Sequence, residues 1–243
     1  MRRPYWIPYH ARPDDFPPLE QALTHPNGLL AVGGDLTVNR LIIAYRNGIF
    51  PWYNEGEPIL WWSPDPRMVL FPDSLKVSRS LRKTIRKAKF TFTMDQHFRD
   101  VIKGCAGPRR KQDGTWITQE MQAAYCQLHD EGFAHSVESW YEGRLVAGLY
   151  GIALGNVFFG ESMFTRMTDA SKVAFVQFVW QLQRWGYELI DCQQQTRHLE
   201  SFGAIAIPRQ EYRALLDNLC EKPFVKGKWR FGRFDSDETG ESH

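Results

Sequence analysis

Two short strand-like runs of this chain each hold an acidic residue among apolar neighbours. One run is residues 159–164, which contains Glu161, and the other is residues 189–193, which contains Asp191 and Gln193. Acids seldom occur in such runs, because a carboxylate is costly to remove from water without a partner. Two acids in such runs, about thirty residues apart, predict a polar site inside the fold.

The spacing of these residues predicts how they are presented. Asp191 and Gln193 are two positions apart, and side chains two apart on a strand face the same way. We expect Glu161 to end a strand that lies nearby in a mixed sheet. The three side chains are candidates for proton transfer and substrate hydrogen bonding. The alternative is a structural network in which the acids pair with Arg166 or Lys172.

Hydrophobic periodicity and turn residues predict the elements that carry this site. A helix, a three-strand meander, a helix and a strand, in that order, indicate an α+β fold with a mixed central sheet flanked by helices. The predicted helices are near residues 37–48, 78–88, 96–104, 119–130, 170–186 and 209–220, and the predicted strands are near 68–71, 90–94, 134–140, 145–154, 157–159 and 188–193, with a last basic and aromatic strand after 220.

Composition shifts divide the chain. Residues 1–66 read as a small N-terminal domain and connector, in which the Pro- and Gly-rich first 35 residues are expected to be irregular. Residues 67–234 form a larger domain, and the polar, acidic residues 235–243 are predicted to be a disordered tail. Trp52, Trp61 and Trp62 are expected to join the two domains.

The overall composition narrows the class of protein. The 243 residues are 43% hydrophobic and 24% charged, which is typical of a globular protein. The sequence has no apolar run of about 18 residues and no apolar segment at its N-terminus, so we expect neither a membrane span nor a signal peptide. The four cysteines are widely spaced and predict reduced thiols in the cytoplasm. The spacing of His and Cys predicts no metal site.

The net charge of +2 hides a basic segment. Between Lys76 and Lys111 the chain has twelve Lys and Arg against two acids, a net charge of +10. Within the helix near residues 78–88, five cations recur at helical spacing, and apolar residues occupy the other face. A solvated helix face is the alternative, but the further cations nearby favour a phosphate-binding surface. The five cations are Arg79, Arg82, Lys83, Arg86 and Lys87.

Several dense motifs, in order over residues 20–215, resemble the leucyl/phenylalanyl-tRNA–protein transferase family. The matching blocks are PNGLLA at 26–31 with GGDL at 33–36, GIFPW at 48–52, WWSPDPR at 61–67, GTWIT at 114–118, GESMF at 160–164, ASK at 170–172 and LIDCQ at 189–193. The resemblance implies a small N-terminal domain and an acetyltransferase (GNAT)-like C-terminal domain.

The resemblance also implies the reaction. Such enzymes transfer Leu, Phe or, less readily, Met from aminoacyl-tRNA to the α-amine of a protein's N-terminal Arg or Lys, which marks that protein for N-end-rule degradation. The tRNA ester is already activated, so no metal, cofactor or acyl-enzyme is required. We expect a cytoplasmic monomer that acts on charged tRNA and protein substrates away from membranes.

Roles follow by resemblance for individual residues. Asp191 would receive the positive charge or proton of the incoming amine, while Gln193 and Glu161 orient that amine. Trp116 would stack on the terminal adenine of the tRNA. The residues that match an apolar pocket for the donor side chain are Leu149, Phe158, Met163, Phe178 and Ile190, with Trp52 as a further wall.

Two other functions compete. An acetyl-CoA-dependent N-acetyltransferase needs a Gly-rich loop that opens a helix and binds pyrophosphate. The nearest match, residues 144–148, is out of register and lies in a predicted strand. A non-catalytic RNA-binding module would explain the basic helix but not Glu161, Asp191 and Gln193.

Overall fold

Two β-sheets organise the protein. The computed structural model describes residues 3–107, 117–224 and 226–232. The small sheet has the order β1-β2-β4-β3 and consists of β1 (Tyr5–Ile7), β2 (Leu29–Gly33), β3 (Phe50–Pro51) and β4 (Leu60–Trp62). The large sheet has the order β11-β5-β10-β9-β8-β7-β6 and consists of β5 (Arg67–Leu70), β6 (Thr91–Met94), β7 (Ala134–Tyr141), β8 (Arg144–Leu154), β9 (Val157–Thr165), β10 (Leu189–Gln193) and β11 (Ile205–Ile207).

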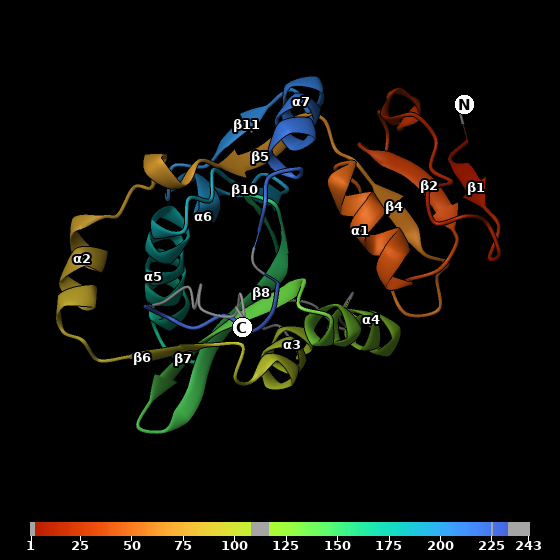
Figure 1. Ribbon diagram of the computed structural model, residues 1–243. Helices are drawn as coiled ribbons and strands as arrows, with labels where there is room; N and C mark the ends of the chain where they lie inside the picture. Colours follow the sequence, from red (N-terminus) through yellow and green to blue (C-terminus); the bar gives the residue numbers. More distant parts are fainter. Residues whose placement is uncertain (1–2, 108–116, 225, 233–243) are drawn as a thin grey trace, which may run out of the picture.

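Helices cover both faces of the large sheet (Figure 1). On one face α5 (Ala170–Arg184) packs on β8 and β9, and α2 (Arg79–Arg86) packs against α5. On the other face α3 (Phe98–Ala106) and α4 (Gln119–Asp130) pack on the sheet, and α1 (Val38–Arg46) contacts α4. The remaining helices are α6 (Arg197–Glu200), α7 (Arg209–Leu219) and the short 3₁₀ helices Leu19–Gln21 and Pro72–Ser74.

The predicted α+β class is confirmed, and most helix and strand predictions in the larger part agree with the structure. The helix predicted at 119–130 is α4, whose first turn is capped by the Thr118 hydroxyl, which accepts the Met121 N–H at 3.2 Å. The longer helices each bury an apolar face that repeats every three to four residues, which is the pattern that the sequence shows clearly.

Three predictions about elements are wrong. The first 35 residues are not all irregular, because β1 and β2 join β3 and β4 in the small sheet. The last strand predicted after residue 220 is absent from the described residues 220–224 and 226–232. The strand predicted at 157–159 continues to Thr165. Strands of two to five residues are too short to show alternation, and β9 turns polar where it meets a cavity.

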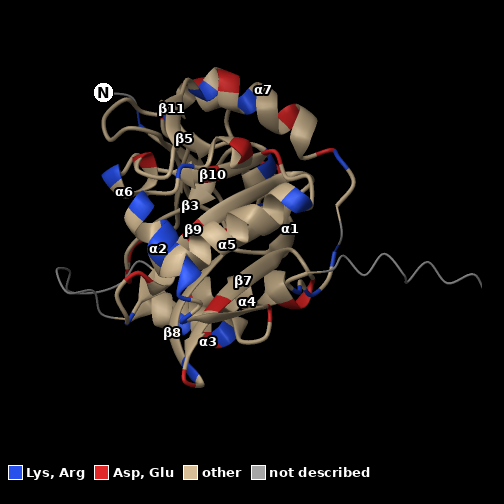
Figure 2. Cartoon of the chain, turned by 90° about the vertical axis from the view of Figure 1, so that its left-hand side faces the viewer, with Lys and Arg blue, Asp and Glu red and all other residues tan. Residues whose placement is uncertain are grey.

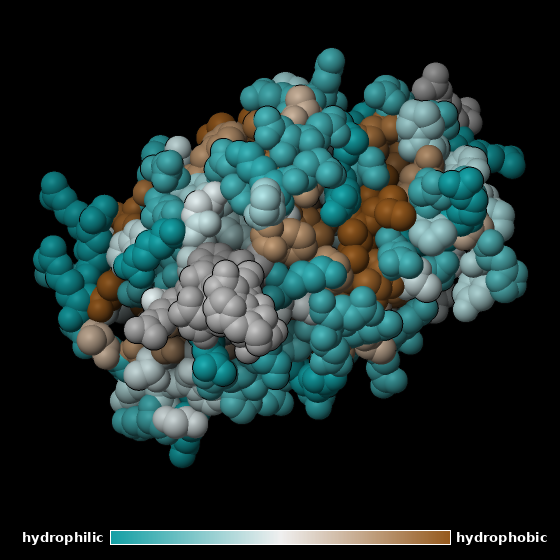
Figure 3. All heavy atoms as spheres, viewed as in Figure 1, coloured by the Kyte–Doolittle hydropathy of each residue, from teal (hydrophilic) through white to brown (hydrophobic). Residues whose placement is uncertain are grey.

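One hydrophobic core runs through both parts of the chain. The small sheet lies before residue 66 and the large sheet after it, yet buried residues from both belong to one contiguous cluster. It includes Leu41, Tyr45 and Trp61 from the first part and Tyr125 and Tyr150 from the second. In the space-filling view, hydrophobic residues gather around the position of α1, and hydrophilic residues surround them (Figure 3). A second cluster lies between the large sheet and α5.

No helix among the described residues is long and apolar enough to cross a membrane.

Gly48 sets the contact between α1 and α7. It follows the last turn of α1 with a φ of +73°, a conformation that favours glycine. A Cβ at this position would lie 2.8 Å from a ring carbon of Tyr212 on α7. The close approach therefore places the Tyr212 ring, and also the Gly48 carbonyl, which takes part in the site described below.

We predict that Gly48→Ala will destabilise the protein more than Gly143→Ala. Gly143 has the same φ of +73° but open space around its Cβ position, so it controls for backbone strain alone. Backbone strain of this kind costs about 1–3 kcal/mol, and the clash with Tyr212 adds to it. Urea unfolding of both variants measures the difference in the free energy of unfolding. Equal losses would show that the contact with Tyr212 places no constraint on α7.

Candidate active site

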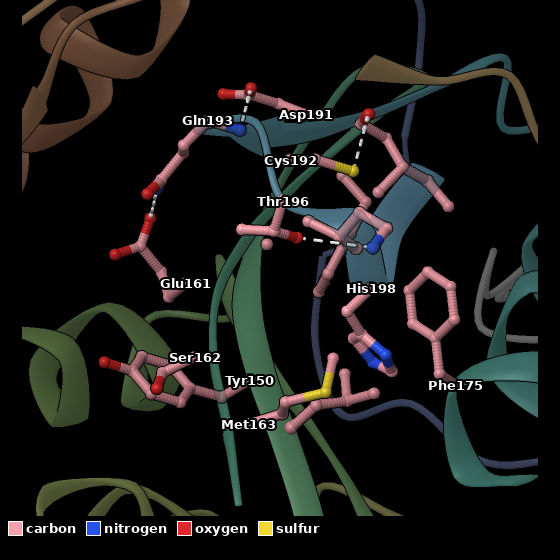
Figure 4. Close-up of a pocket in the computed structure, with 15 residues that line it drawn as sticks. Tyr150, Glu161, Ser162, Met163, Phe175, Asp191, Cys192, Gln193, Thr196 and His198 are labelled. Atoms are coloured by element: carbon pink, nitrogen blue, oxygen red, sulfur yellow. Dashed lines mark hydrogen bonds between the residues drawn. The ribbon is translucent and has the colours of Figure 1, made fainter. Parts of the chain in front are cut away.

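A cavity of about 380 Å³ opens where strands β9 and β10 part (Figure 4). These neighbouring strands are parallel and pair from Leu189 with Val157 to Asp191 with Phe159, and no further. Glu161, Gln193 and the side chains around them line the space beyond the last pair. Ligands commonly bind where adjacent strands of an open sheet diverge.

A β-bulge marks each of the two strands at the cavity. On β9, Tyr150 pairs with Ser162 and Gly151 with Gly160, which leaves Glu161 as the extra residue. On β10, Asp191 pairs with Val69 and Gln193 with Met68, which leaves Cys192 as the extra residue. Bulges redirect side chains and are common beside active sites.

The bulge on β10 separates the two residues that the sequence predicted to face the same way. Gln193 has a φ of +60°, and its side-chain amide points to Glu161, with Nε2 donating to Oε1 at 2.6 Å. The Asp191 carboxylate points away from Glu161 (Figure 4). The two are still linked, because the Gln193 backbone N–H donates to Asp191 Oδ1 at 2.9 Å. The predicted common orientation is wrong, because the extra residue breaks the alternation of the strand.

Asp191 is fully buried in a bidentate ion pair with Arg67 of β5. Arg67 Nε and Nη2 donate to the two carboxylate oxygens at 2.8 and 2.6 Å. The Tyr212 hydroxyl of α7 donates to Oδ2 at 2.9 Å. The structural alternative considered above therefore named the wrong partners, because neither Arg166 nor Lys172 contacts Asp191. Arg166 lies over Phe164, and Lys172 pairs with Asp169.

Several elements hold Arg67 in place. Its guanidinium lies between the rings of Phe50 and Tyr212, 4.7 and 4.9 Å from their centroids, and Nη1 donates to the Gly48 carbonyl at 3.1 Å. Burial alone would lower the pKa of Arg67, but the charge of Asp191 raises it above its ordinary value. The guanidinium therefore stays charged and fixed beneath the cavity.

Glu161 of β9 sits at the centre of a hydrogen-bond network with side chains from three other elements. Tyr45 of α1 donates to Oε1 at 2.7 Å, alongside Gln193, and Tyr125 of α4 donates to Oε2 at 2.9 Å. The two tyrosine hydroxyls also contact each other. Burial raises the pKa of Glu161 to about 8, and the Asp191 charge acts in the same direction, although the hydrogen bonds oppose this shift. Glu161 is therefore mostly protonated at pH 7 when no substrate charge lies beside it.

Comparison with known proteins decides the family. The family model for leucyl/phenylalanyl-tRNA protein transferase matches residues 69–217, and the model for the N-terminal domain of the same family matches residues 34–65. The chain belongs to this family. It is therefore an aminoacyltransferase, and the acetyltransferase and RNA-binding alternatives are not favoured.

Curated relatives agree over almost their whole length. The chain is 61% identical over 215 residues to the leucyl/phenylalanyl-tRNA–protein transferase of Stutzerimonas stutzeri, with 88% of this chain and 95% of that protein covered. It is 59% identical over 225 residues to that of Nitrosospira multiformis, with 93% of this chain and 97% of that protein covered.

Two solved structures show a more distant similarity. One is L-PGS from Bacillus licheniformis, at 11% identity and a TM-score of 0.40, covering 80% of this chain and 74% of that chain. The other is a GCN5-related N-acetyltransferase from Kribbella flavida, at 14% identity and a TM-score of 0.37, covering 72% of this chain and 63% of that chain.

The transferase cavity contains some of the predicted donor-pocket residues. Leu149, Phe158, Met163 and Ile190 line it, and the sequence did not single out Phe175, Cys192, Thr196, His198 and Leu199, which line it too. Two predicted residues do not line the cavity. Phe178 lies behind Phe158, with ring centroids 4.7 Å apart. Trp52 is 38% exposed and packs on Trp62.

Other predicted residues lie outside the cavity or outside the described residues. Trp116 lies outside the described residues. The five predicted tRNA-binding cations are exposed on α2 and its C-terminal end (Figure 2). Leu81 is buried on the opposite face of this helix, and Ala88 is exposed beyond the end of the helix.

The sequence did not single out Arg67, Tyr45, Tyr125 and Tyr212 as site residues. Arg67 offered the same signal as Asp191, because it is a charge at the start of the apolar strand β5. The three tyrosines look like core residues on amphipathic helices. The three tyrosines are indeed buried, as core residues are. A buried tyrosine hydroxyl also needs a hydrogen-bond partner, and here the partners are the two site acids, Glu161 and Asp191.

We predict that Glu161→Gln will change how stability depends on pH. A carboxyl whose pKa is raised in the folded state contributes stability that is present below its unfolded pKa near 4.3 and is lost as pH rises through about 8. The wild type should lose up to about 1.4 kcal/mol per pH unit over that window relative to Glu161→Gln. Chemical denaturation at pH 5.5, 7 and 8.5 measures this difference. Parallel curves for the two proteins would show that Glu161 has an ordinary pKa.

Proposed function

We propose that this chain transfers Leu or Phe, and less readily Met, from aminoacyl-tRNA to the α-amine of an N-terminal Arg or Lys of a protein. The product would be a new peptide bond that marks the protein for N-end-rule degradation in the cytoplasm, where charged tRNA is found. The supporting observation is one cavity with a mostly apolar wall and, at its edge, the Glu161–Gln193 pair.

The reaction needs a neutral amine and a proton for the leaving group. The α-amine attacks the ester carbonyl, a C–N bond forms, and the bond to the ribose oxygen breaks. The ammonium loses one proton before attack, and the nitrogen loses a second as the C–N bond forms. The ribose oxygen gains one of these two protons as it leaves, and the other goes to solvent. The ester is activated already, so holding the two reactants in place supplies much of the rate.

Glu161 is suited to both proton transfers. A free α-amine has a pKa of about 7.7–8.0, and burial raises the pKa of Glu161 to about 8. A proton can therefore pass between groups of nearly equal pKa at little cost. An arriving ammonium also favours the ionised carboxylate, because opposite charges stabilise each other. In our proposal the ionised Glu161 carboxylate takes a proton from the amine nitrogen and then gives that proton to the ribose oxygen.

Asp191 would act through its neighbours in this scheme. Its oxygens accept from Arg67, Tyr212 and the Gln193 backbone, so it fixes the bulge that points the Gln193 amide at Glu161. The sequence-based proposal that Asp191 itself takes up the proton is the alternative, and the two assignments make different kinetic predictions.

The mostly apolar wall would select the donor by size and desolvation. Leu149, Phe158, Met163 and Ile190 offer no hydrogen bond to a polar donor side chain. A pocket of this kind distinguishes donors that differ by one methylene by about 10–200-fold, but it excludes charged side chains strongly.

We predict that the protein will form a peptide bond between leucine and an Arg-initiated peptide only when the tRNA is charged. The assay uses leucyl-tRNA, uncharged tRNA and acetyl-CoA as separate donors. Mass spectrometry should find a Leu-Arg N-terminus with the first donor alone. Acetylation of the peptide, or RNA binding without transfer, would contradict the proposed function.

We predict that Glu161→Gln will lower kcat by about 10²–10⁴-fold and leave the apparent KM for the donor nearly unchanged. Gln193→Ala should be milder, and its double variant with Asp191→Asn should be less than additive, because the two act as a unit. Steady-state transfer over a range of leucyl-tRNA concentrations measures kcat and the apparent KM, with thermal unfolding as the control for folding. Near wild-type kcat in Glu161→Gln, with a large loss in a folded Asp191→Asn, would assign the proton to Asp191.

The basic face of α2 would hold tRNA phosphates without reading sequence. We predict that Arg82→Ala with Lys83→Ala will raise the apparent KM for leucyl-tRNA. The slope of log affinity against log salt should fall by roughly 0.7–0.9 for each phosphate that the variant no longer neutralises. The control pair Arg144→Ala and Lys172→Ala removes the same charge elsewhere on the surface. Equal effects of both pairs would show that α2 contributes only to the overall charge of the protein and does not itself bind tRNA phosphates.

A further inference from the structure

Behind the wall of the donor cavity lies a second layer of side chains, to which the C-terminal end of the described chain contributes Trp229. Trp229 lies beyond residue 217, where the family match ends, and it is buried in the core on the α5 side of the large sheet. The centroid of its ring lies 6.2 Å from the ring centroid of Phe158 and 6.2 Å from that of Phe178. Phe158 lines the cavity, so Trp229 stands directly behind the cavity wall.

Phe158 is confined on its other sides. Its ring meets Phe178 edge to face at 4.7 Å. A Cβ on Gly151 of β8 would lie 2.5 Å from the tip of this ring, so the ring lies directly over the glycine. Closely packed side chains of this kind move only when a neighbour gives way. The size of the Trp229 side chain is therefore one of the few variables that set the position of the Phe158 ring.

Trp229 is itself held firmly. Its indole stacks on His135, with centroids 3.6 Å apart and ring planes 4° from parallel. Its backbone N–H donates to Asp95 Oδ2 at 2.7 Å, and the same carboxylate contacts His135 Nδ1 at 2.8 Å. The segment around Trp229 is thus tied to the start of β7 at a fixed depth behind the cavity.

The indole N–H of Trp229 has no hydrogen-bond partner among the described residues. A buried N–H without a partner is costly, so stability alone would favour an apolar ring at this position. Trp229 therefore acts on its surroundings through the size of its ring and not through a hydrogen bond of its indole N–H.

From these contacts we infer that Trp229 is a specificity-determining residue for the donor amino acid, which acts by fixing the position of Phe158 and hence the depth of the cavity. It is a positioning residue, because it acts through Phe158. This inference rests on the proposed function of the cavity. A smaller side chain at position 229 lets Phe158 move back, and the deeper cavity then favours the larger donor.

The test compares donor preference in Trp229→Ala, Trp229→Phe and the wild type. The ratio of kcat/KM for phenylalanyl-tRNA to that for leucyl-tRNA should rise about tenfold in Trp229→Ala and less in Trp229→Phe. Trp229→Phe also removes the unpaired N–H and keeps an aromatic ring in the core. This variant should therefore stay folded, and its donor ratio can be measured even if the alanine variant unfolds. Ratios within about twofold of the wild type in the folded variants, or ratios that fall, would overturn the inference.

Phe224→Ala is the matched control. Phe224 lies on the same C-terminal segment, but its ring packs on Phe133, 6.1 Å away, and not on a cavity residue. This variant should lose stability without a change in the donor ratio, and an equal change in its ratio would overturn the inference. A wild type that transfers neither amino acid would instead refute the proposed function, so the two failures are distinct.

Discussion

The buried ion pair between Arg67 and Asp191 is the interaction on which the site depends. It joins β5 to β10, draws in the Gly48 carbonyl at the end of α1, and accepts the Tyr212 hydroxyl of α7. Replacing such a pair with apolar residues is often neutral or stabilising, but removing one partner costs about 3–5 kcal/mol. The ion pair therefore matters here for the positions of the side chains that it holds, more than for the stability of the fold. It fixes the bulge at Cys192, and the bulge turns Gln193 to Glu161.

The two acids have different tasks because their surroundings differ. Asp191 faces a guanidinium that balances its charge, whereas Glu161 faces neutral tyrosines and an amide at the edge of the cavity. Two carboxyl groups whose surroundings differ in this way are typical of acid–base sites. The α1 helix supplies Tyr45, so the small N-terminal part completes the site instead of merely adjoining it.

The sequence predicted the parts of the fold that repeat with a clear period. The helices near α4 and α5, and the meander of β7 and β8, agree with the structure because each hides a regular apolar face. The sequence also identified Glu161, Asp191 and Gln193 as candidate site residues. It could not predict the two bulges, because a bulge depends on which residue pairs across the sheet. For the same reason it could not find Arg67 as the partner of Asp191, which lies 124 positions later.

The central claim is that the pKa of Glu161 is raised at the edge of the cavity until it matches that of an α-amine, so that the carboxylate, once an arriving ammonium favours its ionised form, exchanges a proton with that amine at little cost. Carbon-13 NMR of the glutamate side-chain carboxyl, assigned with Glu161→Gln, measures this directly as pH is varied. The account predicts that Glu161 titrates near pH 8 in the empty protein. It also predicts ionisation at lower pH when an Arg-initiated peptide is bound. Titration near pH 4.5, unaffected by the peptide, would contradict it.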